Sequence, residues 1–341
     1  MVQLYIIQLK NIIYVQRDKK ILIIYFMVNI VLGTMNILNP YSSKKTSIIE
    51  ERDMINSFLH NYPNGYIDTA YYYGLGKSQE RLGKILSMVD SNYKIASKAN
   101  PWFENDFSTG RLGQLNREGL TQQCITCKND LGKKMDLFYL HAYDHETKLE
   151  ETLETIDLLY RKEYFNKWAI SNFSYDHILN TIKICEKNDY LLPSCYQGMY
   201  NMFCRKVEVI FPLLRDYEIP FWAYNPLCGG LIINCNKEEQ IGRFTNPVYQ
   251  SIFGSPSMLQ ACKEFNMKYC DTNTIIEKAY DWILNKSYLN PSDSLIIGAS
   301  SLEQLENNIS IIKNIKSKND ELFINSVYNS ILDKDIPNYW Y

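Results

Sequence analysis

The amino-acid sequence predicts an α/β protein with a single (β/α)8-barrel domain. Eight short apolar runs recur along the chain, each bounded by polar or turn residues, which is typical of strands buried on both faces of a sheet. The stretches between them carry apolar residues at intervals of three and four, the spacing of an amphipathic helix. Strands and helices that alternate in this way indicate a parallel sheet, and eight such units close most naturally into a TIM barrel.

The expected strands and helices follow one another in a regular order. The strands are expected at residues 28–33, 65–69, 93–99, 135–141, 165–172, 194–200, 219–225 and 294–298. The helical spacing is clearest at residues 78–89, 150–162, 175–187 and 271–284. Residues 232–257, after the seventh strand, are longer and less regular, and a loop of this length is usually functional or disordered.

An open, doubly wound sheet is the competing architecture. It would need a glycine-rich dinucleotide-binding turn directly after its first strand. The first expected strand is followed by Thr34-Met35-Asn36, and no second or third glycine occurs at the required spacing after Gly33. The sequence therefore favours the barrel.

Composition indicates a globular protein and argues against several classes of partner. Of the 341 residues, 46% are hydrophobic and 22% are charged, the balance of a chain with a large core. A net charge of −2 provides no basic surface for nucleic acid. The nine cysteines follow no repeating frame, which indicates reduced thiols and a cytoplasmic location.

Residues 1–26 precede the expected barrel of residues 27–341, and we interpret them as a non-catalytic N-terminal extension. Charged residues interrupt their apolar character, among them Lys10, Arg17 and Asp18. The longest uncharged run, residues 21–33, is too short to span a bilayer. A signal peptide would need a continuous apolar core and a small-residue cleavage site, and neither is evident. We therefore expect no stable membrane association, and a membrane anchor is the minor alternative.

Reactive side chains lie where the second, third and fourth expected strands end. They are Asp68, followed by Tyr71, Tyr72 and Tyr73, then Lys98, and then His141. In a TIM barrel the carboxyl ends of the strands form the active site. A lysine and an aspartate in that mouth are expected to pair, because an isolated buried charge is costly. A tyrosine beside the ammonium would have its pKa lowered from about 10, which suits a general acid worth about 10²–10⁴-fold in rate.

Each of these residues alone also fits a structural role, since strand ends often hold a polar residue that satisfies loop backbone. Their occurrence together on three successive strands favours an active site. The next strand ends carry Ser171-Asn172, Gln197 and Tyr224-Asn225. No cysteine or serine has an evident base partner, so the sequence does not support a covalent mechanism.

Two later segments favour an anionic cofactor, because phosphates on this fold commonly bind between the loops after strands seven and eight. The first, residues 225–231, contains Gly229 and Gly230, which permit close approach of the backbone. The second, residues 298–304, pairs Ser300 with Glu303 in a capping-box pattern, which predicts a helix that begins there with exposed amide groups. A helix start of that kind binds phosphate.

Longer motifs follow the same order along the chain. They are Leu32-Gly33-Thr34-Met35, Asp68-Thr69-Ala70, Ile95-Ala96-Ser97-Lys98-Ala99-Asn100-Pro101-Trp102, Asp136-Leu137-Phe138-Tyr139-Leu140-His141-Ala142, Ser171-Asn172, Tyr196-Gln197-Gly198-Met199-Tyr200-Asn201, Ala223-Tyr224-Asn225-Pro226-Leu227, Gly242-Arg243-Phe244, Ser300-Ser301-Leu302-Glu303-Gln304-Leu305 and Pro337-Asn338-Tyr339. With these motifs, residues 28–341 resemble the aldo-keto reductases, and most closely their aflatoxin-aldehyde reductase branch.

The resemblance implies a catalytic tetrad of Asp68, Tyr73, Lys98 and His141. Tyr73 would be the proton donor, whereas Tyr71 and Tyr72 fall on variable positions. Lys98, paired with Asp68, would depress the pKa of the phenol, and His141 would orient the substrate carbonyl.

The resemblance also implies NADPH/NADP⁺ as cofactor. Ser171, Asn172 and Gln197 would hold the nicotinamide carboxamide, with Tyr224 stacked beneath the ring. The two loops would bind the phosphates, through Asn225, Pro226, Leu227, Gly229 and Gly230 in the first and Gly298 and Ser300 in the second. The adenosine and its 2′-phosphate would lie against Arg243, Ser301, Gln304 and Asn308. An arginine that faces this phosphate selects NADPH over NADH.

The chain departs from the family pattern at several positions. After Gly230 the family commonly continues Thr-Gly-Lys-Tyr, a strap over the cofactor, whereas residues 232–236 here read Ile-Ile-Asn-Cys-Asn. The branch usually ends in an arginine that holds a substrate carboxylate, but this chain ends in Tyr341. The branch's preference for acidic aldehydes is therefore not carried over. Gln79 stands where many relatives have glutamate.

No metal site is expected. Cys124 and Cys127 form a C-x-x-C pair, but they fall in an expected helix and no second pair follows at zinc-like spacing. His141 and His145 belong to no H-E-x-x-H arrangement.

The resemblance implies a reductase that converts aldehydes, and by extension dicarbonyls or ketones, to alcohols with NADPH. The alternative is an NADPH-binding regulatory or sensor protein that resembles the potassium-channel β subunits, with little or no turnover. A third interpretation, an unrelated barrel hydrolase or isomerase, predicts that nicotinamide cofactors are ignored. The expected partners are a small carbonyl substrate and, as in many members of the branch, a second copy of the chain.

Overall fold

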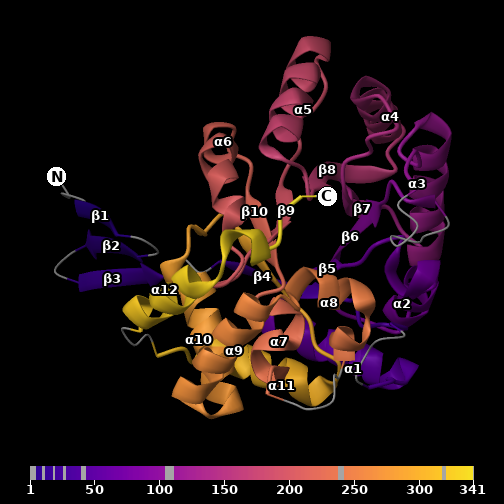
Figure 1. Cartoon of the computed structure of the whole chain (residues 1–341). Helices are drawn as coiled ribbons and strands as arrows, with labels where there is room; N and C mark the ends of the chain where they lie inside the picture. Colours follow the sequence, from indigo (N-terminus) through magenta and orange to yellow (C-terminus); the bar gives the residue numbers. More distant parts are fainter. Residues whose placement is uncertain are drawn as a thin grey trace.

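The computed structural model describes residues 5–9, 12–17, 20–25, 28–39, 44–103, 111–236, 242–316 and 320–340. Among these, the side chains of residues 5–9, 12–17, 20–25, 242, 243 and 248 lie outside the description. Figure 1 shows a closed barrel of strands surrounded by helices, with a small separate sheet at the N-terminal side.

The barrel is closed by eight parallel strands in the order β10-β11-β4-β5-β6-β7-β8-β9. The strands are β4 (Asn29–Gly33), β5 (Tyr66–Asp68), β6 (Lys94–Ala99), β7 (Met135–Leu140), β8 (Phe165–Ser171), β9 (Tyr196–Met199), β10 (Phe221–Tyr224) and β11 (Ser294–Ile297). Each lies inside its predicted range, so the predicted (β/α)8 barrel is confirmed. The strands β8 and β10 stop one residue short because Asn172 and Asn225 adopt positive φ angles of 58° and 56°, which extended backbone cannot accommodate.

Helices cover the outside of the barrel (Figure 1). They are α1 (Ile48–Asn61), α2 (Ser78–Leu86), α3 (Arg117–Leu131), α4 (Leu149–Arg161), α5 (Tyr175–Asn188), α6 (Phe211–Asp216), α7 (Leu231–Asn234), α8 (Pro247–Phe253), α9 (Pro256–Tyr269), α10 (Thr272–Asp281), α11 (Leu302–Lys313) and α12 (Glu321–Ser330). The four helices with the clearest sequence periodicity are all present. The last of them continues as the π-helical turn η7 (Trp282–Lys286).

The prediction of an irregular loop at residues 232–257 is wrong in part. It contains α7, the 3-10 turn η6 (Gly242–Thr245) and α8. Short helices form here because they bring apolar side chains into the core, among them Ile232, Phe244, Tyr249 and Phe253. Residues 237–241 lie outside the described part of the chain.

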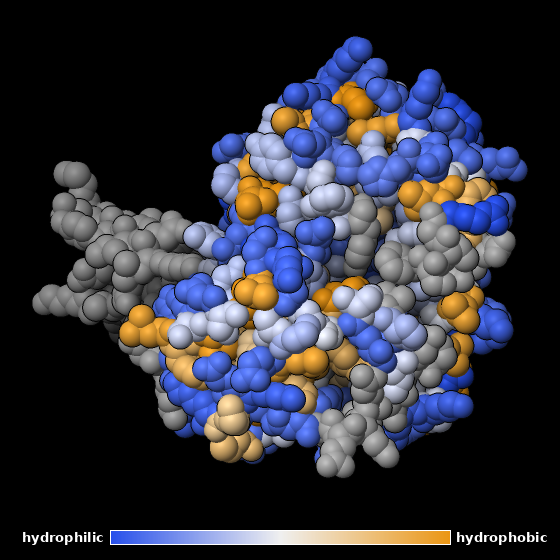
Figure 2. Space-filling model, viewed as in Figure 1, coloured by the Kyte–Doolittle hydropathy of each residue, from blue (hydrophilic) through white to orange (hydrophobic). Residues whose placement is uncertain are grey.

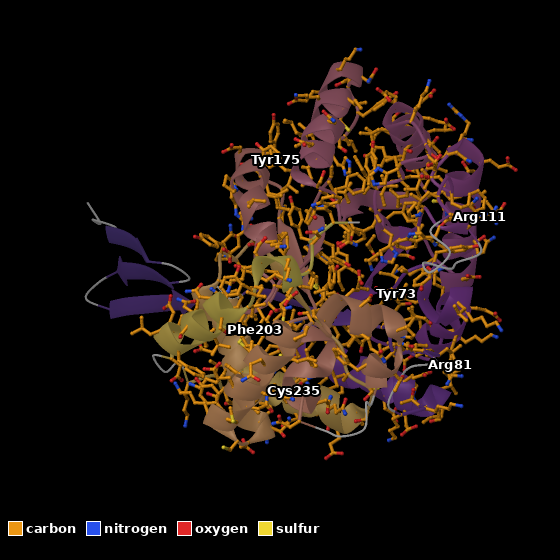
Figure 3. All side chains as sticks on the ribbon, viewed as in Figure 1. Tyr73, Arg81, Arg111, Tyr175, Phe203 and Cys235 are labelled. Atoms are coloured by element: carbon orange, nitrogen blue, oxygen red, sulfur yellow. The ribbon has the colours of Figure 1, made fainter. Side chains whose placement is uncertain are left out.

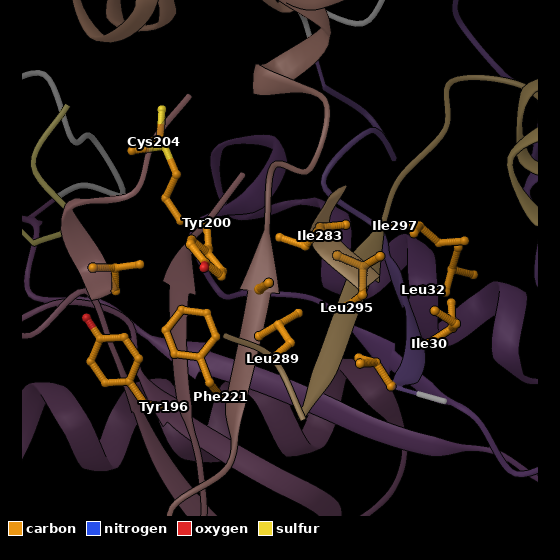
Figure 4. Close-up of a cluster of buried hydrophobic side chains, with 14 of the residues drawn as sticks. Ile30, Leu32, Tyr196, Tyr200, Cys204, Phe221, Ile283, Leu289, Leu295 and Ile297 are labelled. Atoms are coloured by element: carbon orange, nitrogen blue, oxygen red, sulfur yellow. The ribbon is translucent and has the colours of Figure 1, made fainter. Parts of the chain in front are cut away.

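Alternate residues of each strand face opposite sides of the barrel wall, as the two-residue period of a strand requires. The inner cluster includes Val31, Leu137, Ala169 and Trp222. Their neighbours in sequence, such as Ile30 and Leu32 on β4, belong to the outer cluster between strands and helices, part of which is shown in Figure 4. The barrel interior is therefore filled, and a ligand site has to lie at the end of the strands.

Residues before the barrel form three antiparallel strands, β1 (Tyr5–Leu9), β2 (Ile12–Arg17) and β3 (Lys20–Tyr25). Among the described residues, these strands pair only with one another. A sheet was not expected in this segment. Its interpretation as a non-catalytic extension, with the barrel domain beginning near residue 27, stays a prediction.

Figure 2 shows a surface in which hydrophilic side chains predominate and hydrophobic ones are scattered. Within the described ranges, none of the helices combines the length and the apolar character that crossing a membrane requires.

Candidate active site

A buried ion pair lies at the carboxyl ends of β5 and β6. Lys98 Nζ is 2.5 Å from Asp68 Oδ2 and donates a second hydrogen bond of 2.7 Å to the carbonyl oxygen of Thr69. Gln197 on β9 donates from Nε2 to the other carboxylate oxygen of Asp68, at 3.1 Å. Burial raises the pKa of Asp68 and lowers the pKa of Lys98, and the contact between the two charges opposes both shifts. The pair lies buried beneath the mouth of the barrel.

Tyr73 and His141 lie directly beside this pair. Lys98 Nζ is 5.3 Å from the centroid of the Tyr73 ring, and the Tyr73 and His141 rings meet edge to face with centroids 5.9 Å apart. Tyr73 begins the short 3-10 turn η1 (Tyr73–Gly76), in which Gly74 and Leu75 have positive φ angles. The structure thus brings the four predicted catalytic side chains together at one end of the barrel. Their catalytic roles stay predictions.

His141 is held in its neutral form. Burial lowers its pKa well below 6.5, and the charge of Lys98 lowers it further. Its Nδ1 is buried and has no hydrogen-bond partner among the described residues. A neutral imidazole can donate one hydrogen bond to a carbonyl oxygen.

This burial predicts an acid-dependent loss of stability. As pH falls below about 6.5, the unfolded chain protonates His141 while the folded state keeps it neutral, so the free energy of unfolding decreases by at most about 1.4 kcal/mol per pH unit from this group. Urea unfolding of the His141→Gln variant is expected to show a smaller loss between pH 7 and pH 5 than the parent. The matched control is His60→Gln, on the exposed end of α1. Equal acid sensitivity in both variants would contradict the neutral buried imidazole.

A second group of polar side chains, Ser171, Asn172 and Tyr224, lies at the carboxyl ends of β8 and β10. Asn172 donates from its amide nitrogen to the carbonyl oxygen of His141 at 2.9 Å and to Ser171 Oγ at 3.1 Å. Its amide oxygen accepts a 2.7 Å hydrogen bond from the Tyr224 hydroxyl. These bonds fix the orientation of Asn172 and Tyr224, and they link the tetrad to the loop after β10.

In the loop after β10, the two glycines adopt backbone angles that other residues rarely reach. Gly229 and Gly230 have φ angles of 65° and 96°. A Cβ atom on Gly229 would lie 2.8 Å from Cε1 of Tyr249, whereas one on Gly230 would approach only Asn234, at 3.6 Å. The backbone at Gly230 is therefore open to a ligand.

The predicted helix start after β11 is displaced by one residue. The N-cap of α11 is Ser301, whose side chain accepts a hydrogen bond from the amide of Gln304. The expected capping box of Ser300 with Glu303 is wrong, because Gln304 Oε1 instead accepts hydrogen bonds from both the amide and the hydroxyl of Ser300. The first turn of α11 still points toward the mouth of the barrel, since Ser300 and Gln304 line the cavity described next.

One cavity of about 520 Å³ joins these features. Its lining includes most of the predicted site residues, namely Asp68, Tyr73, His141, Ser171, Asn172, Gln197, Tyr224, Asn225, Pro226, Leu227, Gly229, Gly230, Gly298, Ser300, Gln304 and Asn308. Lys98 lies buried beneath it, and Ser301 caps the helix without contributing to the lining. The Arg243 side chain lies outside the described part of the chain.

Several lining residues were missed by sequence reasoning. They include Asn36, Tyr72, Trp102, Met199, Tyr249 and Tyr280. For two of them a signal existed, because Tyr72 adjoins Tyr73 and Trp102 closes the motif that contains Lys98. The others come from the loop after β4, from β9, from α8 and from α10, and they face the cavity because these separate elements pack together.

The C-x-x-C pair lies on α3, in the predicted helical stretch. Both thiols are buried and free, and burial raises the pKa of Cys127 to about 12. A thiol with so high a pKa is a poor nucleophile and a poor metal ligand. The pair therefore packs as part of the core.

A family model and several known proteins match this chain. Residues 29–325 match the model of the aldo/keto reductase family. The chain is 34% identical over 265 residues to human aflatoxin B1 aldehyde reductase member 4, covering 71% of this chain and 78% of the relative. It is 30% identical over 334 residues to rat aflatoxin B1 aldehyde reductase member 2, covering 91% and 87%.

Solved structures share the fold. A glycerol dehydrogenase from Gluconobacter oxydans has a TM-score of 0.68 at 19% identity, covering 90% of this chain and 93% of its own. An aldo/keto reductase from Klebsiella pneumoniae, solved with NADP and acetate, has a TM-score of 0.62 at 17% identity, covering 92% and 93%. Because the family model spans most of the chain and its relatives are matched over most of their length, this protein belongs to the aldo/keto reductase family and is an oxidoreductase of that family.

Proposed function

We propose that this protein reduces aldehydes, and by extension dicarbonyls or ketones, to alcohols with NADPH, using Tyr73 as general acid. The observation that carries the proposal is the placement of Lys98, Asp68, Tyr73 and His141 at one end of a cavity that also reaches the first turn of α11. The names of the relatives, aflatoxin B1 aldehyde reductases, and the NADP bound in a structural neighbour support the same chemistry.

The cavity fits a dinucleotide at both of its ends. At one end, Ser171, Asn172 and Gln197 present the hydroxyl and amide groups that a carboxamide can bind. At the other, Gly230 leaves its backbone open and α11 directs its N-terminal turn at the cavity, an arrangement that favours phosphate. When bound there, NADPH supplies the hydride that reduces the carbonyl carbon.

The protein side of the reaction follows from the tetrad. The neutral His141 imidazole donates a hydrogen bond to the substrate carbonyl oxygen and orients it. Tyr73 then transfers its phenolic proton to that oxygen as the alcohol forms. The Lys98 ammonium favours the phenolate that remains, because opposite charges attract across a site from which water is excluded. Asp68 keeps Lys98 charged and in place, and Gln197 fixes Asp68.

We propose that Arg243, together with Ser301, Gln304 and Asn308, binds the 2′-phosphate side of the cofactor and so gives a preference for NADPH over NADH. An arginine binds a phosphate through charge-assisted hydrogen bonds, each worth about 1.5–3 kcal/mol. Arg243→Ala is therefore expected to raise the KM for NADPH by about 10- to 100-fold while the KM for NADH changes little. Steady-state kinetics with each cofactor measure the two values. A parallel rise for both cofactors would contradict a contact with the 2′-phosphate.

The proposal as a whole is tested by NADPH oxidation in the presence of 4-nitrobenzaldehyde and a panel of dicarbonyls, followed by absorbance. Turnover that depends on both the cofactor and the carbonyl is the expected result. Tight binding of NADPH with no turnover across the panel would favour the alternative of a cofactor sensor. A protein that ignores nicotinamide cofactors altogether would contradict both.

A further inference from the structure

Aromatic rings form the wall of the cavity around His141. Tyr72 and Trp102 approach each other edge to face, with ring centroids 5.4 Å apart. Trp102 lies 5.4 Å and Tyr72 lies 6.4 Å from the centroid of the His141 imidazole, again edge to face. All of them line the cavity together with Tyr73. A carbonyl compound held by Tyr73 and His141 would therefore rest its remaining atoms against Tyr72 and Trp102.

The described lining of this cavity carries little charge. Among the described residues that line the cavity there is no lysine or arginine, and Asp68 provides the only carboxylate. Lys98 is fully buried below and is engaged by Asp68 and the Thr69 carbonyl oxygen. A substrate that carried a carboxylate would thus lose its hydration here without gaining a cationic partner, which is costly.

Arg111 is the first positively charged residue after Trp102 in the sequence, and its side chain contacts a neighbouring aromatic ring. The Arg111 guanidinium packs over the Phe103 ring at 4.9 Å from its centroid, and the residue is exposed. Figure 3 shows Arg111 near the right-hand edge of the view beside α3, whereas Tyr73 lies farther from that edge. Arg111 is therefore not placed to neutralise an anionic substrate.

We propose that the carbonyl substrate of this site is an uncharged aromatic aldehyde or ketone, and that the site discriminates against carbonyl compounds with a carboxylate. This inference rests on the reductase function proposed above. Tyr72 and Trp102 offer a planar substrate ring the edge-to-face or offset-stacked contacts that aromatic groups prefer, and such a pair is worth about two- to tenfold in binding. The absence of a cation among the described lining residues supplies the discrimination.

The charge part is tested with two para-substituted benzaldehydes that differ chiefly in charge, 4-carboxybenzaldehyde and its neutral methyl ester, methyl 4-formylbenzoate. The expected kcat/KM with NADPH is at least about tenfold higher for the ester. Equal values, or a preference for the acid, would overturn the proposal. The aromatic part is tested with benzaldehyde against cyclohexanecarbaldehyde, where a preference for the saturated ring would overturn it.

The position of the wall is tested with two variants of Tyr72, which is half-buried. Tyr72→Arg is expected to raise the ratio of kcat/KM for the acid over the ester by about tenfold, because it places a cation in the acceptor space. Tyr72→Gln, the matched neutral change, is expected to leave this ratio unaltered. An unchanged ratio in Tyr72→Arg would show that Tyr72 does not face the substrate. Failure of the parent protein to turn over any carbonyl would instead overturn the reductase function and this inference with it.

Discussion

Replacing Lys98 with methionine is expected to reduce kcat by about 10²–10⁴-fold, because the phenolate of Tyr73 would lose the only ammonium beside it among the described residues. The same change leaves the Asp68 carboxylate buried without its partner, since both side chains are inaccessible to solvent in the pair. Breaking a buried ion pair on one side costs about 3–5 kcal/mol of stability. The two effects are measured by single-turnover kinetics and by urea unfolding.

The control for this variant lies on the same strand. Lys94 also places its ammonium over a tyrosine ring, 5.2 Å from the centroid of Tyr66, but it is exposed at the other end of β6. Lys94→Met should keep nearly full activity and stability. The double variant Lys98→Met with Asp68→Asn should recover part of the stability but none of the activity. Recovery of activity in the double variant would contradict the role given to the ammonium.

Replacing Tyr73 with phenylalanine is expected to lower kcat by a similar 10²–10⁴-fold, roughly the worth of a general acid. The ring that contacts Lys98 and His141 is retained, so the fold and the affinity for NADPH should change little. Turnover by absorbance and NADPH binding by fluorescence separate the two properties. Tyr71→Phe is the matched control, because Tyr71 is a neighbouring tyrosine that does not line the cavity. Full turnover by Tyr73→Phe would show that another group donates the proton.

The barrel and its catalytic end were predictable from the sequence because both depend on local signals. A strand buried on both faces leaves a continuous apolar run, and the residue that follows such a run is placed at the same end of the barrel as all the others. Asp68 ends β5, Lys98 lies near the end of β6 and His141 follows β7, so their proximity follows from strand order alone. Tyr73 required the resemblance to distinguish it from Tyr71 and Tyr72.

The details that sequence reasoning missed depend on contacts between distant segments. Ser300 and Ser301 are chemically equivalent candidates for a helix cap, and the choice between them is made where the chain leaves β11. The hydrogen bond from the Gln197 amide nitrogen to Asp68, a residue 129 positions away, was not foreseen, whereas the assignment of Gln197 to the cofactor stays a prediction. Tyr249 on α8 and Tyr280 on α10 reach the cavity through the way these helices pack, which a single sequence does not reveal.

The short helices after Gly230 could not be predicted from sequence for a different reason. Its irregular pattern suggested a loop, yet α7 and α8 form because Ile232 and Phe253 are fully buried. Helices of this length have little stability of their own, and tertiary packing decides whether they form.

The proposed mechanism depends on one role of the Lys98 ammonium, which is to make Tyr73 a ready acid. It is tested most directly by labelling the tyrosines with ¹³C at Cζ and following their NMR signals against pH, with Tyr73→Phe to identify the signal of Tyr73. We predict that Tyr73 titrates below the value of about 10 that is usual for tyrosine, and that this shift disappears in Lys98→Met. A Tyr73 signal that titrates at or above 10 in the parent protein would contradict this role of Lys98.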